Sequence, residues 1–173
     1  LGGDEMLRFK ALMRERLQAN PRGDGPGYDI YPPDLGEPYR ARRAKCGEDM
    51  YASMGIGRED KMSRLSFIAG NFQFWNAPVG MFFCLDKQMG PPQWSDLGMY
   101  IQTLMLLARE AGLHSCPQEA WTLWHKTVGE FLGLPDNQKL FCGLALGYAD
   151  HEHPVSRVRT ERAPLEEFAT LKG

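Results

Sequence analysis

Apolar residues recur at helical spacing near the start of the chain. Met6, Phe9 and Met13 fall on one side of a helix, because 3.6 residues complete each turn. The spacing predicts a helix that begins almost at the first residue. Residues 20–38 are then dense in glycine and proline, and this predicts a long loop without regular structure.

Two further helices are predicted before the first strand. A polar, basic helix should run from Pro38 to about Met54, and Gly55-Ile56-Gly57 should end it. This glycine pair favours a helix-ending turn over a phosphate-binding loop. A second helix should run from Arg58 to about Ala69 and lead into an aromatic cluster at residues 71–76.

Two continuous apolar runs, residues 78–85 and 140–148, predict buried strands, because runs without polar alternation suit a sheet covered on both faces. Between them lies the strongest helical pattern of the chain. Its main stripe comprises Leu97, Ile101, Leu104, Ala108 and Ala111, and Met99, Met105 and Leu106 make other faces apolar too. We therefore expect this helix to be buried nearly all round, either by the domain core or by a partner subunit.

Gly112 should end that helix, and another should start soon after it and run to about Leu132. Ser115 with Gln118 three residues later fits a capping box, and Pro117 suits a first helical turn. The residues between Leu113 and Leu132 are therefore predicted as helix rather than strand.

Strands separated by long helices predict an α/β (α+β) fold in which helices flank a central sheet. We expect a single domain over residues 1–173. Residues 149–173 are polar and interrupted by proline, so they should form an extended C-terminal arm rather than a core element.

Composition narrows the class of protein. With 173 residues, 43% hydrophobic residues and a formal net charge of -2, the chain can fill one core and offers no general attraction for nucleic acid. It contains no run of about 20 apolar residues and no leader-like opening, so we expect a soluble, cytoplasmic protein and no membrane partner. Its four scattered cysteines favour buried, reduced thiols over a disulfide or a zinc site.

Several segments together resemble one family. They are residues 112–119, the strand end Ala145-Leu146-Gly147-Tyr148, and the tail from Pro154 to Arg162, with Ala77-Pro78 and Asp96-Leu97-Gly98 in support. In their order and separation they resemble the FMN-dependent nitroreductase family. The resemblance implies a nitroreductase-like fold with a central mixed sheet, and a homodimer whose subunits exchange their C-terminal arms.

The resemblance assigns a role to Pro117, Gln118, Glu119 and Ala120. In the family, this segment passes over the flavin ring and offers a backbone N–H group to flavin N5. A helix start suits that role, because its first N–H groups lack a helical partner and its positive end favours negative charge. On the local sequence alone, an ordinary capped helix without a ligand is the alternative.

Arg157 and Arg159 are two residues apart, so an extended tail would direct both guanidinium groups to the same side. By similarity to the family, their target is the FMN phosphate, which arginine binds through paired, charge-assisted hydrogen bonds. Arg162 is a weaker candidate for the same role. A solvated basic tail is the alternative for an isolated Arg-x-Arg.

One departure from the family pattern concerns the beginning of the chain. The family's N-terminal Arg-Arg-Ser-x-Arg stretch and a later asparagine-containing loop, which contact the cofactor, do not occur here. The chain also opens on Leu1-Gly2-Gly3, which resembles the end of a strand. We therefore expect a truncated or processed product. If this chain is the whole molecule, its affinity for FMN should be much reduced.

The resemblance implies an enzyme in which NADH or NADPH passes a hydride to flavin N5, and a nitroaromatic or quinone-like acceptor is then reduced at the same site. It names no catalytic protein residue. A dehalogenase or dehydrogenase on the same flavin fold remains open, as does a non-enzymatic dimer that retains no flavin. His151-Glu152-His153 supplies too few ligands for catalytic zinc, and His114 and His125 are interpreted as structural residues.

Overall fold

The computed structural model describes residues 1–172, which form two compact units. The first unit comprises Leu1–Asp34 and Met62–Ala149 and contains the sheet. The second comprises Leu35–Lys61 together with the described residues from Asp150 onward. Both units are built from segments that are far apart in the sequence.

The sheet of the first unit has three strands in the order β1-β3-β2. The strands are β1 (Val79–Asp86), β2 (His114–Gln118) and β3 (Gln138–Gly147). Both pairings are antiparallel, so in the described residues the expectation of a mixed sheet is wrong. The reason is topological: β1 and β2 run in the same direction on either side of β3, so they never pair with each other.

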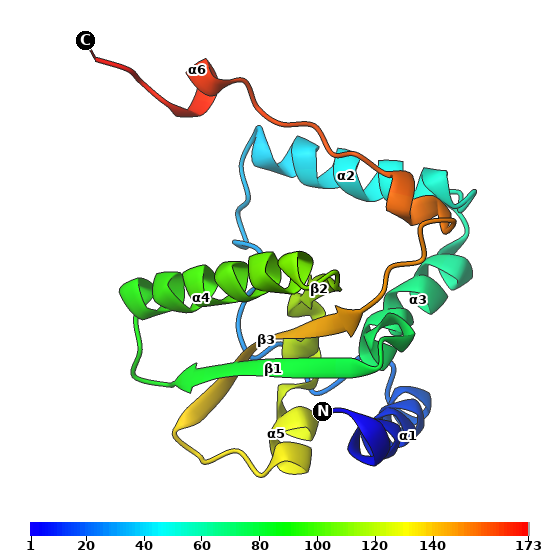
Figure 1. Ribbon diagram of the computed structural model, residues 1–173. Coiled ribbons are helices and arrows are strands. Elements are labelled where there is room, and N and C mark those ends of the chain that lie inside the picture. The colour runs from blue at the N-terminus through cyan, green and yellow to red at the C-terminus, as the bar shows by residue number, and fades with distance from the viewer. Residues whose placement is uncertain (173) are drawn as a thin grey trace. The chain divides into compact units, whose positions relative to one another are not determined.

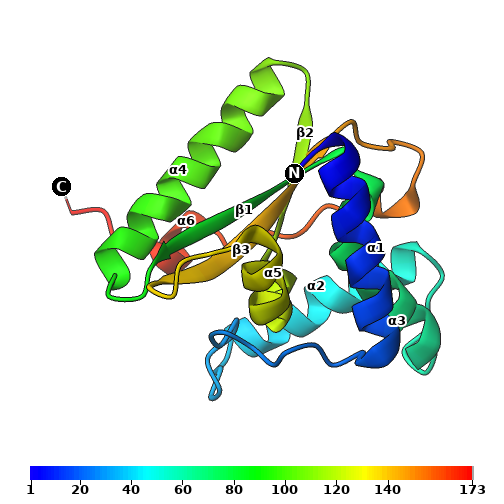
Figure 2. The same ribbon diagram turned by 90° about the horizontal axis from the view of Figure 1, so that it is seen from below.

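Helices cover the two faces of this sheet (Figures 1 and 2). Helix α4 (Pro91–Glu110) lies on one face, and α1 (Gly3–Ala19) and α5 (His125–Leu132) lie on the other. Alternation along β1 explains why both faces are apolar: Phe83 packs in the cluster with α4, and its neighbour Phe82 packs in the cluster with α1. The predicted sheet with two covered faces is therefore confirmed.

Most predicted elements occur close to their expected bounds. In α1 the stripe of Met6, Phe9 and Met13 is buried in the core, and residues 21–38 contain neither helix nor strand. Helix α3 (Lys61–Ala69) leads into a short 3₁₀ segment, η1 (Gly70–Asn76), that carries the aromatic cluster. These features confirm the helical periodicity, the long loop and the position of the first strand.

Helix α4 is less buried than its composition predicts. Ile101 is 6% exposed and packs with Leu97 and Leu104 against the sheet, as the main stripe predicts. Away from the sheet, α4 exposes the apolar side chains of Met99, Leu106 and Leu107. Tyr100 is exposed at the flank of the helix, with its ring 6.2 Å from that of Phe83 in β1. The domain core therefore covers only one side of α4, because a sheet can cover only one side of a helix, and burial of the other sides by a partner subunit stays a prediction.

The second unit consists of α2 (Tyr39–Ser53), the 3₁₀ turn η3 (Pro154–Arg157), the short helix α6 (Leu165–Phe168) and the chain around them. The tail lies along α2 (Figure 1), and an ion pair joins Arg42 to Glu167. Lys45 of α2 lies 3.3 Å from Glu161. Because these side chains are at least two-fifths exposed, each ion pair contributes at most about 1 kcal/mol to the free energy of unfolding.

Among residues 1–172, no helix is both long enough and apolar enough to cross a bilayer.

Candidate functional site

The segment expected to meet the flavin ring begins as a strand rather than a helix. His114–Gln118 pairs with β3, with Cys116 opposite Ala145 and Gln118 opposite Gly143. The predicted capping box of Ser115 and Gln118 is therefore wrong. Pro117 is tolerated here because β2 is an edge strand, and such a strand can leave one side of its backbone without ladder bonds.

The strand passes directly into a 3₁₀ helix, η2 (Glu119–Trp124), and α5 follows. The helix predicted up to about Leu132 is therefore confirmed only after β2, as η2 followed by α5 (His125–Leu132). Pro117 and Glu119 are exposed, whereas Gln118 between them is 2% exposed. The β2–η2 junction, residues 117–120, thus presents reachable residues on either side of a buried side chain.

The buried Gln118 amide is bonded at both of its ends. Its Nε2 donates to the backbone oxygen of Asn71 at 3.0 Å and lies 3.3 Å from the side-chain oxygen of the same residue. Its Oε1 accepts a hydrogen bond from Trp121 Nε1 at 3.3 Å. Because all its polar atoms have partners inside the protein, this amide is not available to a ligand in the described structure.

Trp121 lies beneath the junction in the aromatic core. It is fully buried, with its ring 4.7 Å from the ring of Phe74 and 5.1 Å from that of Phe82. The aromatic residues Phe72, Phe74 and Trp121 therefore form part of the core, and their faces are not open to a ligand. Trp75 is the exception, because it is 37% exposed and packs against Phe67.

Arg157 and Arg159 lie in the second unit, whereas the β2–η2 junction belongs to the first. Arg157 ends the turn η3, so the wholly extended tail assumed for this pair is wrong at its first member. Its side chain is 70% exposed and lies 3.3 Å from Glu152. Arg159 is exposed as well and donates from Nη1 to the backbone oxygens of Ser156 and Val158, each at 3.0 Å.

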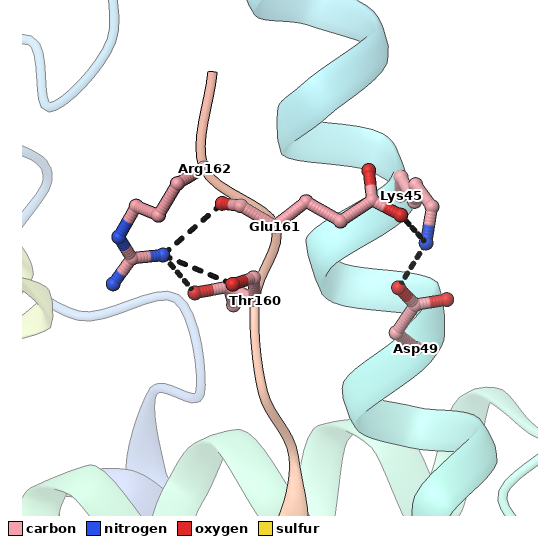
Figure 3. Close-up of polar contacts among 5 residues, drawn as sticks. All are labelled: Lys45, Asp49, Thr160, Glu161 and Arg162. Carbon is pink, nitrogen blue, oxygen red and sulfur yellow. Dashed lines mark hydrogen bonds and ion pairs between the residues drawn. The ribbon is translucent and has the colours of Figure 1, made fainter. Parts of the chain in front are cut away.

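Arg162 is held by its own stretch of chain. Its Nη1 donates to the backbone oxygens of Thr160 and Glu161, each at 3.1 Å, and to the Thr160 hydroxyl at 2.5 Å. Figure 3 shows its guanidinium on one side of the tail and the Glu161 carboxylate on the other, directed at Lys45. Arg159 is bonded to its own stretch of chain in the same way, so these bonds do not separate Arg162 from Arg159 as a phosphate candidate.

All four cysteines are free thiols, as expected. The expectation that they are buried is wrong for Cys46 and Cys116, which are exposed. Cys142 of β3 is buried, and burial, with a contribution from the charge of Glu119, raises its pKa to about 12. Burial also raises the pKa of Cys84. These two thiols therefore stay protonated and unreactive near neutral pH.

The residues 1–172 contain no group of three or more histidine, cysteine or acidic side chains that could hold a metal ion. His125 instead serves the fold, because its Nδ1 lies 3.2 Å from the backbone oxygens of both Gly25 and Thr122. This contact ties the loop before Tyr28 to η2. The structural interpretation of His125 is therefore confirmed.

Sequence reasoning did not find Asn71 or Trp121 as partners of Gln118. Asn71 precedes Gln118 by 47 residues, and no local pattern relates the two. Only the packing of η1 against η2 brings them together. An asparagine directly before an aromatic cluster gives no indication of such a role by itself.

Comparison with known proteins now identifies the family. The model of the nitroreductase family matches residues 59–148, which include α3, η1, α4, the β2–η2 junction and all three strands. The chain belongs to the nitroreductase family. The match covers most of the first unit, so the expected nitroreductase-like fold is confirmed.

Named relatives and solved structures agree with this nitroreductase assignment. The chain is 38% identical over 142 residues to a 4-nitrobenzoate reductase of Pseudomonas putida, covering 82% of this chain and 63% of that protein. It is 33% identical to a chloronitrobenzene nitroreductase of Comamonas testosteroni, covering 99% of this chain and 75% of that protein. The nitroreductase chain thus spans about two thirds to three quarters of these relatives.

Two crystal structures extend the likeness to the whole chain. The FMN and NADPH-dependent nitroreductase NfnB from Sphigopyxis sp. strain HMH has a TM-score of 0.94 at 43% identity, covering 100% of this chain and 78% of that chain. The FMN-dependent NfnB from Mycobacterium smegmatis, solved in complex with NADPH, has a TM-score of 0.91 at 28% identity, covering 100% and 77%.

Proposed function

We propose that this nitroreductase binds FMN and reduces nitroaromatic or quinone-like acceptors with NADPH or NADH as the reductant. The observation that carries the proposal is the likeness to the Sphigopyxis enzyme, which is named as FMN and NADPH-dependent and matches this chain over its full length. The curated relatives reduce nitrobenzoate and chlorinated nitrobenzene, as their names state. A flat, electron-poor aromatic acceptor is therefore the substrate class of the proposal.

The β2–η2 junction fits the ring of such a cofactor. Pro117 and Glu119 are exposed, so a ligand can reach the backbone on both sides of Gln118. The first N–H groups of a helical segment have no partner within it and favour negative charge. We assign the ring contact to the backbone of Pro117–Ala120, in which Glu119 and Ala120 open η2.

Arg157 and Arg159 fit a phosphate group. Both guanidinium groups are exposed, and each can make charge-assisted hydrogen bonds to phosphate oxygens. The Glu152 carboxylate is 90% exposed, so Arg157 can exchange this weak ion pair for a phosphate at little cost. We assign the FMN phosphate to these two arginines.

Bound FMN would supply the redox chemistry, since it can take up a hydride at N5 and pass electrons to an acceptor. The chain's own residues then bind and orient. The N–H groups of η2 would stabilise negative charge on the ring, the arginines would hold the phosphate, and the aromatic core under Trp121 would keep the junction in place. We assign no protein acid or base.

We further propose a homodimer, because α4 exposes Met99, Tyr100, Leu106 and Leu107. The tail adds Phe168 and Leu171, which are 69% and 84% exposed and suit an arm that packs on a second copy. We propose a cytoplasmic location, because NADH and NADPH are intracellular reductants.

Purified protein tests the enzymatic proposal directly. We expect a yellow solution with flavin absorption bands, or uptake of added FMN, and bleaching of those bands when NADPH is added without oxygen. Addition of a nitrobenzoate should then restore the colour. A colourless protein that takes up no added FMN would contradict the proposal. Bleaching without reoxidation by nitroaromatics would favour a flavin enzyme with different chemistry.

A further inference from the structure

We infer that Gln118 is a positioning residue whose buried amide holds the backbone at the start of η2 in the place where it meets the flavin. The inference rests on the proposed function, because it concerns the same β2–η2 junction. The family expectation concerns only a backbone N–H group of this segment. The inference adds a role for the side chain of Gln118, which acts inside the protein.

The burial of Gln118 is the first argument. The residue is 2% exposed, and a buried amide without hydrogen-bond partners is destabilising. Here Nε2 donates to Asn71 and Oε1 accepts from Trp121, so the amide is satisfied at both ends. A satisfied buried amide allows one orientation, whereas an apolar side chain of similar size could shift without a comparable loss.

The bond to Asn71 is the second argument, because Asn71 belongs to a different element from the junction. Asn71 lies in η1, and its own Nδ2 donates to the backbone oxygen of Ile68 at 3.0 Å, at the end of α3. The bonds from Gln118 to Asn71 therefore tie the β2–η2 junction to the end of α3 and the start of η1. No local contact along the chain could do this, since 47 residues separate the two positions.

Trp121 fixes the other end. Its ring lies so close to Gly143 that a Cβ atom on Gly143 would be 2.3 Å from Trp121 Cδ1. Gly143 is also the register partner of Gln118 in the sheet. Trp121 thus contacts both the Gln118 amide, through its indole N–H group, and the backbone of β3 at Gly143. These contacts hold Glu119 and Ala120 at the junction.

The Gln118 amide should affect the orientation of the backbone N–H group at the flavin more than the affinity for FMN. A backbone N–H that must face one ring atom works only when it is held within a few tenths of an ångström, and a misplacement of about 1 Å can cost roughly 100-fold in rate. Arg157 and Arg159, which are proposed to bind the phosphate, lie outside the β2–η2 junction. Loosening the junction should therefore slow hydride transfer while changing FMN binding less.

The first experiment replaces the amide with an apolar side chain of similar length, Gln118→Met. In the FMN-free protein, we expect peptides covering residues 114–124 to exchange backbone hydrogen for deuterium roughly tenfold faster than in the wild type. In the FMN-loaded protein, we expect the rate of flavin bleaching at saturating NADPH to fall roughly tenfold or more. Unchanged exchange and an unchanged bleaching rate would overturn the inference.

Gln118→Glu is the second variant, because it is nearly isosteric and keeps an acceptor for the Trp121 N–H group. The ionised carboxylate cannot donate to Asn71, whereas the protonated form can donate to Asn71 and still accept from Trp121. We therefore expect its bleaching rate to rise as the pH is lowered, relative to the wild type at each pH. A parallel pH profile in the two proteins would contradict a positioning role.

Thr127→Val is the matched control. Thr127 is 3% exposed and its hydroxyl donates to Asp24 at 3.1 Å, so the variant also removes a buried hydrogen bond. We expect it to lower the melting temperature while leaving exchange in residues 114–120 and the bleaching rate as they are. If the wild type takes up no FMN, the proposed function fails, whereas the exchange experiment on FMN-free protein still decides whether Gln118 holds the junction.

Discussion

At the residue scale, one glycine shows how closely the core under the junction is packed. Gly143 in β3 lies against the Trp121 ring, and Trp121 itself is fully buried among other aromatic rings. The ring cannot move aside, because protein interiors are packed about as densely as organic crystals. Gly143 is therefore required by a close approach, which an apolar strand pattern does not reveal.

We predict that Gly143→Ala destabilises the protein by about 1–3 kcal/mol, the usual cost of forcing an extra methyl group into a packed core. The added Cβ would lie 2.3 Å from Trp121 Cδ1, well inside any normal contact distance. Urea unfolding followed by tryptophan fluorescence measures this change. An unchanged midpoint would show that the Trp121 ring is free to shift.

Gly129→Ala is the control for this prediction. Gly129 lies inside α5, and its added Cβ would be 4.0 Å from Leu134 Cδ1, an ordinary contact. Alanine stabilises a helix interior by up to about 1 kcal/mol relative to glycine, so this variant should be neutral or more stable.

At the element scale, β2 illustrates the limit of local patterns. Its residues carry a good helix-start pattern, yet they form a strand, because pairing with β3 satisfies their backbone and buries Gln118. The turn η3 is a second case, since proline at its first position favours a helical turn over a fully extended tail. In both segments, the local pattern predicts the wrong backbone conformation.

We predict that Arg157→Ala combined with Arg159→Ala weakens FMN binding at least tenfold. Each charged hydrogen bond that is lost is worth about 1.5–3 kcal/mol, and 1.4 kcal/mol corresponds to a factor of ten. Titration of the FMN-free protein with FMN, followed by flavin fluorescence, measures the affinity.

Arg8→Ala is the matched control for the double variant. Arg8 is as exposed as Arg157, at 70%, and likewise pairs with a glutamate, Glu5. We expect it to leave FMN affinity unchanged. Equal affinity in the double variant and the wild type would rule out the assignment of the phosphate to the tail.

At the scale of the whole molecule, the exposed side of α4 is the feature that the single chain leaves unexplained. Two leucines, a methionine and a tyrosine at about 60% exposure on one helix are unfavourable in water and are typical of an interface. In the proposed homodimer, a second copy of the chain would cover this side of α4.

We predict that replacing Leu106 and Leu107 with glutamate converts a dimer into a monomer, because two buried carboxylates without partners would oppose association. Light scattering coupled to size-exclusion chromatography measures the mass. Leu7→Glu on α1 is the control, because it also replaces an exposed leucine (65%) with glutamate, but away from α4. We expect it to leave the dimer intact. A dimer that survives the double substitution would place the interface on another surface.

Much of the fold follows from periodicity. The stripes of α1 and α4, the two apolar strands and the breaker-rich loop are each encoded within a few neighbouring residues, because helices and strands bury one face at a characteristic spacing. The order of the motifs also sufficed to indicate the family, and residues 59–148 match its model.

What only the tertiary structure decided are relations between distant residues. The insertion of β3 between β1 and β2, the conversion of residues 114–118 from a helix start to a strand, and the bonds from Gln118 to Asn71 and Trp121 all depend on partners far along the chain. The physical reason is that a local pattern specifies which face is apolar, whereas the partner that covers it is selected by the packing of the whole core.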